Sequence, residues 1–347
     1  MALLAREALS DGDDVTLLTR SEARSAPQWD FLRTALKEGL KVVDESDFSS
    51  ANIGAIADRL GCDVVTVPDA DRFVLTLFGP RRWRGRALLV CLIMRSVSQP
   101  RRSQLLTRSI TMIRRSIFWA AGRAGRVRVV FLRSALVPPD DERGRWAVDP
   151  IEFVATRQHA ARYREAVGIG PAKRVFAVVG ALDERKNVPL IVEALAGANL
   201  PDLVLLLAGR IADSARSSID ASVRSGRAEG LEIVVDDRVL PDADLDSAVL
   251  AADCLVLAYS NEGPSGILGK AMVAGIPVIA AGAQSLRRDS QLRPTLMKWV
   301  PLTATALRES IVVSKVFLNA DRPRSDSAVL RAVDGFVDPL LRRSEGN

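Results

Sequence analysis

The chain is poor in the residues that several common chemistries need. Its 347 residues include one histidine, His159, and three widely separated cysteines, Cys62, Cys91 and Cys254. Zinc knuckles and dithiol redox motifs need closely spaced pairs, so we expect neither, and unpaired cysteines are typical of a reducing cytosol. No apolar run reaches the roughly 18 residues that span a bilayer. Acidic residues follow the first short apolar stretch, which is not typical of a signal peptide. We therefore expect a cytoplasmic protein.

Acidic residues and lysine are absent from one long segment. Between Phe73 and Pro139 the only charged side chains are fourteen arginines. Such an uneven distribution of charge gives information about binding partners and not about the fold. We interpret Arg81–Arg133 as a surface for an anionic membrane or a phosphate-bearing ligand, the alternative being ordinary solvated arginines. Few aromatic residues are interspersed, so no nucleic acid is expected. Apolar residues at helical spacing suit equally an interfacial helix on anionic lipid and a helix packed on a domain core: Ile110, Ile113, Ile117 and Phe118.

Strand-length apolar runs alternate with helical patterns along the whole chain, which indicates parallel α/β domains. The clearest runs are unbroken, so they predict strands covered by helices on both faces. They are Val175–Val179, Leu203–Leu207, Ile233–Val235, Cys254–Leu257 and Val278–Ala280. The first half has weaker runs at Val15–Thr19, Lys41–Val43, Asp63–Val67, Ala87–Met94 and Val127–Leu132. We predict a helical connecting piece at Ile151–Val167.

The first half begins in an unusual way. The first predicted element is a helix, Ala2–Leu9, in place of the central first strand and glycine-rich turn of a doubly wound sheet. Two interpretations follow, a translation start upstream of Met1 or a degraded N-terminal domain, and we favour the first.

The stretch from Cys254 to Ala281 carries the most information about function. It reads as a buried strand, a polar loop, a helix with Ser265 as N-cap, and a second buried strand. Ligands of open α/β sheets bind at the carboxyl ends of the strands. Because the first amides of a helix are free and face the positive end of its dipole, Gly266 and Ile267 predict a diphosphate site. A plain strand–helix turn is the alternative.

Three motifs follow one another in this stretch: Tyr259-Ser260-Asn261-Glu262-Gly263, then Lys270-Ala271-Met272, then Gly275-Ile276-Pro277-Val278. Together they resemble the signature of family-four glycosyltransferases. Upstream, the stretch from Gly180 to Asn187 resembles a Gly-Arg-Leu and Lys-Asn segment, and Leu207-Ala208-Gly209 resembles a strand-end motif. The resemblance covers Tyr163 to Ile311 well and the first half loosely.

The resemblance implies a transferase that moves a sugar from a nucleotide diphosphate, of UDP or GDP type, with retention of configuration. It implies catalytic roles for Lys186, which would neutralise the diphosphate, and Glu262, which would contact sugar hydroxyls. Arg238 and Val239 would flank the nucleobase. The other implied donor-binding residues are Gly180, Arg185, Gly209, Gly263, Ser265, Gly266, Ile267 and Lys270.

Two positions depart from the family pattern. The second glutamate, which binds ribose, is replaced by Lys270, and the arginine partner of the diphosphate by Ala181, with Arg185 close enough to substitute. The N-terminal histidine of the family has no match, and His159 is expected to be a surface residue of the connecting helix. The alternative function is therefore a weak or inactive relative that binds a nucleotide or a partner.

The sequence thus predicts two Rossmann-like doubly wound parallel-sheet domains facing a cleft, the GT-B arrangement. We expect an acceptor domain at residues 1–150, a connection at 151–172, a donor domain at 173–315 and a helical end at 316–347. The expected acceptor is phosphate-bearing, lipid-linked or part of the cell envelope, with peripheral attachment to the inner membrane face. Neither a cofactor nor a metal is predicted, since Asp236-Asp237 lacks the Asp-x-Asp spacing and Asp242 suits a helix cap.

Overall fold

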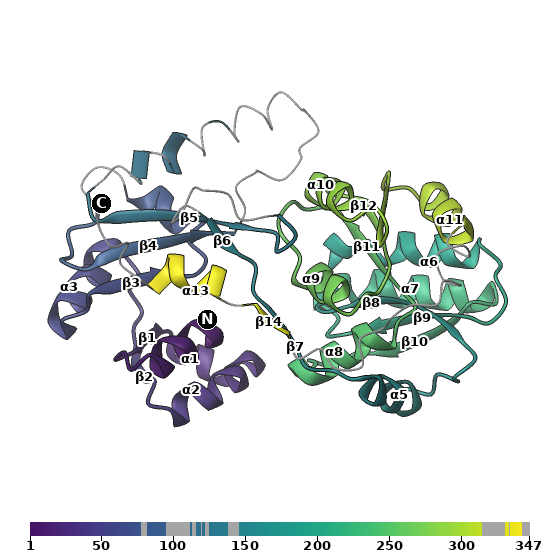
Figure 1. The fold of residues 1–347 in the computed structure, drawn as a ribbon, viewed down its shortest axis with the longest axis horizontal. Coiled ribbons are helices and arrows are strands. Elements are labelled where there is room, and N and C mark those ends of the chain that lie inside the picture. The colour runs from purple at the N-terminus through teal and green to yellow at the C-terminus, as the bar shows by residue number, and fades with distance from the viewer. Residues whose placement is uncertain are drawn as a thin grey trace. The chain divides into compact units, whose positions relative to one another are not determined.

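A computed structural model describes residues 1–77, 82–94, 112, 116–118, 120–121, 125–137, 146–313, 330–332 and 334–341. Most of the arginine-rich segment lies outside these residues. The chain divides into two compact units (Figure 1). The first unit comprises residues 1–133, 139–148 and 334–347, and the second comprises residues 134–138 and 149–333. The C-terminal helix α13 (Asp334–Leu341) therefore belongs to the first unit, where the Leu340 carbonyl accepts a 2.8 Å hydrogen bond from the Thr66 hydroxyl. The sequence analysis did not predict that the end of the chain belongs to the first unit.

The second unit is built on six parallel strands in the order β10-β9-β8-β11-β12-β13. The strands are β8 (Arg174–Val179), β9 (Leu203–Ala208), β10 (Glu232–Asp236), β11 (Cys254–Tyr259), β12 (Val278–Gly282) and β13 (Met297–Val300). All five apolar runs predicted as strands are confirmed, and β13 is an additional edge strand. Every residue of β9 is buried, as expected for a strand covered on both faces.

Two hydrophobic cores lie on the two faces of this sheet. Because side chains alternate along a strand, Val175, Ala177 and Val179 of β8 enter one core, while Phe176 and Val178 enter the other. The first core is covered by α5 (Arg157–Ala166), α8 (Asp242–Ala251), α9 (Gly266–Val273) and α10 (Gln284–Leu292). The second is covered by α6 (Val188–Ala196), α7 (Asp213–Ala228) and α11 (Ala304–Val313). The predicted helices on both faces are confirmed.

The strands of the first unit form two parallel sheets instead of the expected one. A four-stranded sheet has the order β3-β4-β5-β6 and a separate pair joins β1 and β2. The strands are β1 (Thr16–Thr19), β2 (Lys41–Asp44), β3 (Val64–Val67), β4 (Leu88–Ile93), β5 (Val127–Arg133) and β6 (Trp146–Val148). Besides α13, the described residues of this unit form the helices α1 (Ala2–Ser10), α2 (Arg33–Lys37) and α3 (Ser50–Leu60). They also form the 3₁₀ turns η1 (Ser21–Ser25), η2 (Pro27–Leu32) and η3 (Phe73–Thr76).

The arginine-rich segment contributes one helical piece to the core of the first unit. Phe118 is 1% exposed and contacts Phe131 edge-on, with ring centroids 5.9 Å apart. This burial favours the core-packed interpretation of that helical pattern, whereas Ile110 and Ile113 lie outside the described residues. No helix in the described ranges is both long enough and apolar enough to cross a bilayer.

The predicted connecting helix is wrong over its first residues. Ile151–Phe153 forms strand β7, which pairs antiparallel with β14 (Leu330–Ala332). Helix α5 begins only at Arg157, because the Thr156 hydroxyl accepts the amide of His159 and the His159 ring accepts the amide of Thr156. The single histidine of the chain is thus part of a capping box, at the exposed end of a helix.

Candidate functional site

The order in which the chain adds strands to the sheet of the second unit reverses between β8 and β11. From β8 the chain continues to β9 and β10 on one side, then crosses to β11, β12 and β13 on the other. Open α/β sheets bind ligands at the carboxyl ends of the strands flanking such a switch point. The loops that leave β8 and β11 meet here, since the Ser260 amide donates to the Arg185 carbonyl at 3.0 Å and the Asn187 side chain donates to the Ala258 carbonyl at 2.8 Å.

Asn187 is the N-cap of helix α6 by position only. Its backbone is left-handed, with φ 48°, and no side-chain cap hydrogen bond forms. The side chain instead joins the turn η5 (Glu184–Lys186) to the end of β11 through the bonds to Arg185 and Ala258. The loop that carries Lys186 is thereby fixed against the neighbouring strand.

Two glycines keep the carboxyl edge free of side chains beside the switch point. Gly180 follows β8 with φ +90° and Gly209 follows β9 with φ +137°, a region in which side chains are strained. A Cβ on Gly209 would lie 2.4 Å from the Gly180 carbonyl oxygen. Both were predicted as donor-binding residues, and the structure places them in direct contact.

The ammonium of Lys186 lies under this edge. Lys186 is only 9% exposed, and its Nζ donates a hydrogen bond to the Val179 carbonyl. A Cβ on Gly180 would lie 3.2 Å from that Nζ and 3.6 Å from the Ile267 side chain. Burial lowers the pKa of Lys186 to about 8, so the group is cationic at neutral pH and poorly hydrated. It is a preformed partner for an anion.

Helix α9 begins on the opposite side of the same point. The Ser265 hydroxyl accepts the Leu268 amide at 3.3 Å, which confirms Ser265 as the N-cap. Among the described residues, no hydrogen-bond acceptor is found for the amides of Gly266 and Ile267. A helix start leaves such amides for an external acceptor. The structure therefore places Gly180 next to both the Lys186 ammonium and the side chain of Ile267 in the first turn of α9. The diphosphate site itself stays a prediction.

A carboxyl that the sequence analysis missed lies beside these amides. Asp149 Oδ2 is 3.8 Å from the position a Cβ on Gly266 would take. Burial raises the pKa of Asp149 to about 6, so the group is ionised at pH 7 and adds negative charge next to the helix start. No sequence pattern could have found it, because Asp149 precedes the helix by more than a hundred positions.

The Glu262 carboxylate, which is predicted to contact sugar hydroxyls, also accepts backbone amides of the protein. Its two carboxylate oxygens accept the amides of Gln284 and Ser285, at 2.8 and 2.9 Å, at the start of α10. Gly263 follows with φ +140°, and its amide lies 3.5 Å from the Ser285 hydroxyl. Because each carboxylate oxygen has a second lone pair, a sugar hydroxyl can still be bound. The sugar contact remains a prediction.

Lys270 does not face the site in the predicted way. Its ammonium forms an ion pair with Asp246 of α8 at 2.5 Å and donates to the Glu152 carbonyl at 2.6 Å. The Asp246 side chain is 1% exposed, and its other oxygen accepts the Val154 amide at 2.7 Å. The cause is the buried carboxylate on α8, whose charge requires a partner. We assign Lys270 to the contact between α9, α8 and β7 in place of donor binding.

Arg185 and Arg238 are both held by carboxylates. Arg185 pairs with Asp183 within its own turn at 2.6 Å. Arg238 follows β10, and its neighbour Val239 is 37% exposed. The Asp236 carbonyl accepts the Gly209 amide at 2.9 Å, so the residues after β10 are linked to the glycine edge described above. The base-binding role of Arg238 and Val239 remains a prediction.

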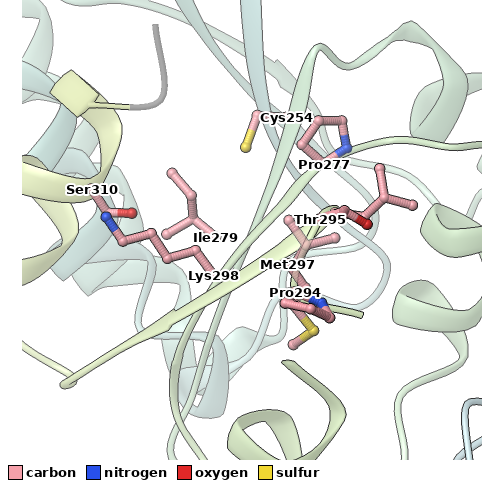
Figure 2. A pocket seen from close by; sticks show the side chains of 10 residues that line it. Cys254, Pro277, Ile279, Pro294, Thr295, Met297, Lys298 and Ser310 are labelled. Carbon is pink, nitrogen blue, oxygen red and sulfur yellow. The ribbon is translucent and has the colours of Figure 1, made fainter. Parts of the chain in front are cut away.

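The small pocket drawn in Figure 2 lies at the opposite edge of the sheet. It is lined by the starts of β11, β12 and β13, including Cys254, Val278 and Met297. Its interior of about 20 Å³ suits one water molecule. It is too small for a nucleotide and plays no part in the candidate site.

The family comparison agrees with the geometry of this edge. Residues 173–293 match the family model described as glycosyl transferases group 1. The matched segment covers about a third of the chain and contains every site residue predicted above. The resemblance inferred from the motifs is confirmed. No curated protein sequence matches the chain.

Solved structures with the same fold cover both units. WaaG, a glycosyltransferase involved in lipopolysaccharide biosynthesis, is 14% identical, with a TM-score of 0.61 over 99% of this chain and 94% of that one. HepE from Anabaena is 15% identical, with a TM-score of 0.61 over 92% and 86%. Sucrose-phosphate synthase from Thermosynechococcus elongatus is 16% identical, with a TM-score of 0.57 over 90% and 82%. The likeness shows the fold, so the predicted GT-B class of two parallel α/β domains is confirmed.

Proposed function

We propose that the chain transfers a sugar from a nucleotide diphosphate donor, and that the diphosphate binds at the switch point between β8 and β11. One observation carries the proposal: Gly180, which has no side chain, lies next to both the Lys186 ammonium and Ile267 in the first turn of α9. The leaving nucleotide gains negative charge in the transition state, and preorganised donors at this position stabilise that charge. The structures of HepE with UDP and with UDP-glucose support a donor of the UDP type.

The proposal includes retention of configuration. Inverting enzymes of this architecture commonly use a histidine base, whereas His159 is part of the capping box of α5. Retention needs no strong enzyme base to deprotonate the acceptor, so the residues present are compatible with it.

The acceptor is proposed to be phosphate-bearing, lipid-linked or part of the cell envelope, reached at the cytoplasmic membrane face. Two observations support this proposal. WaaG, which has the same fold, is involved in lipopolysaccharide biosynthesis. In this chain, Arg82, Arg84 and Arg86 of the acid-free segment are exposed, and clustered arginines attract anionic lipid.

A second candidate is a non-catalytic relative that binds a nucleotide or a partner protein. It is favoured by the ion pair of Lys270 with Asp246, which leaves the ribose of a donor without the carboxylate that the family pattern supplies.

Calorimetry with UDP and GDP, followed by a donor hydrolysis assay, tests the proposal. We expect micromolar to millimolar binding of at least one nucleotide diphosphate, the usual range of substrate affinities, and slow release of sugar from the matching donor. Binding without hydrolysis or transfer supports the second candidate. Absence of binding contradicts the proposal and the nucleotide-binding form of the second candidate. Adding anionic vesicles to the same preparation tests attachment, since failure to co-sediment contradicts the membrane proposal.

A further inference from the structure

A buried tyrosine joins helix α5 to the residues that follow β10. The Tyr163 hydroxyl donates to Asp236 Oδ2 at 2.7 Å, and Tyr163 is 6% exposed. Burial, and then the Asp236 carboxylate, raise the pKa of Tyr163 well above its ordinary value, so the hydroxyl keeps its proton. Asp236 is the last residue of β10, and its orientation is therefore fixed from the helix side.

The other oxygen of Asp236 holds Arg238. Asp236 Oδ1 accepts from Arg238 Nε at 2.9 Å, and a terminal nitrogen of the same guanidinium donates to Asp244 of α8 at 2.7 Å. Isolated surface ion pairs of arginine contribute little and leave the side chain mobile. Here the guanidinium lies between two carboxylates, one of which is itself fixed by Tyr163.

This network lies two strands away from the proposed diphosphate position, with β9 in between. The Gly209 amide bonds to the Asp236 carbonyl, and β9 separates β10 from β8. Two strand spacings amount to about 10 Å, which is the order of the distance between a diphosphate and its base across the ribose. The exposed side chain of Val239 provides an apolar surface next to Arg238.

We propose that Tyr163 and Asp236 are positioning residues that fix the Arg238–Val239 loop and thereby determine which nucleobase the donor carries. The inference rests on the proposed function. The guanidinium has only N–H donors, so the loop favours a base with carbonyl oxygens at its edge, uracil or guanine, over adenine, which presents an amino donor. A purely structural link between α5 and the sheet is the competing explanation.

Tyr163→Phe separates the two explanations, because it removes only the hydroxyl. Calorimetry on the full chain would compare UDP, GDP, ADP and inorganic pyrophosphate, which occupies the diphosphate position without reaching the loop. We expect the UDP or GDP affinity to fall about five- to ten-fold, the effect of one typical lost hydrogen bond, since Tyr163 acts on the base only through Asp236. Pyrophosphate affinity should be unchanged, and the preference over ADP should shrink.

Arg216→Ala is the matched control. Arg216 pairs with Asp237, next to Asp236, at 2.6 Å and does not contact Arg238; this variant should keep the base preference. Parallel weakening of pyrophosphate and UDP in Tyr163→Phe, or an unchanged preference over ADP, overturns the inference alone. If the unmodified chain binds neither UDP nor pyrophosphate, the proposed function fails first and the inference with it.

Discussion

Replacing Lys186 with methionine should weaken UDP binding about 100-fold, which corresponds to ~3 kcal/mol for a hydrogen bond to a charged group. The substitution keeps the length and apolar stem of the side chain and removes the charge. In the described part of the chain no carboxylate pairs with the buried Lys186 ammonium, and burial of this charge is unfavourable, so its removal should not lower the melting temperature. Calorimetry and thermal unfolding measure the two effects on the same sample.

The pH dependence of the same residue provides an independent check. The folded pKa of Lys186, about 8, is lower than its ordinary value of 10.5, so the unfolded chain binds more protons between these values. The free energy of unfolding should therefore gain a contribution that rises with pH from 8 to 10.5, and Lys186→Met should lack it. UDP affinity of the unmodified chain should fall above pH 8, as the ammonium is lost.

Lys173→Met is the control for this prediction. Lys173 immediately precedes β8, at the opposite end of that strand, and pairs with Glu232 at 2.9 Å. The Lys173→Met variant should bind UDP with the affinity of the unmodified chain. Unfolding of Lys186→Met at ordinary temperature would instead make Lys186 a structural residue.

Replacing Asp246 with alanine should destabilise the second unit by about 3–5 kcal/mol, the usual effect of leaving a buried charge unpaired. The variant leaves the Lys270 ammonium, whose side chain is 13% exposed, without its ion-pair partner. It also removes the acceptor of the Val154 amide. The double variant Asp246→Ala, Lys270→Met should recover part of the loss, because no charge is then buried. Urea unfolding measures both free energies.

The double variant also tests the role assigned to Lys270. Since its ammonium is directed to Asp246 and the Glu152 carbonyl, UDP affinity of the folded double variant should match that of the unmodified chain. A ten-fold loss of UDP affinity would show that Lys270 contacts the donor and that our assignment is wrong.

Local patterns predicted the second unit well. The unbroken apolar runs form strands because every residue in them can be buried when helices cover both faces of the sheet. Ser265 caps α9 because its hydroxyl accepts the amide three residues later in the chain. The prediction of a helix over Ile151–Phe153 was wrong for a non-local reason. Ile151–Phe153 is a strand only because β14 pairs with it from 330–332.

The partners of the site residues could not be predicted from the sequence. Lys270 occupies a position where the family pattern suggests a donor contact, but its ion pair with Asp246 depends on how α8 and α9 pack. Glu262 binds amides at the start of α10, and Asp149 reaches α9 from the connection between the units. Each contact joins residues far apart in the chain, so only the folded structure reveals it.

A structure of the chain with UDP bound tests the central claim most directly. The account predicts that the β-phosphate lies within hydrogen-bond distance of Lys186 Nζ and of the Gly266 or Ile267 amide, with the base toward Arg238. A diphosphate bound elsewhere, with the Lys186 ammonium still bonded to the Val179 carbonyl alone, would contradict it.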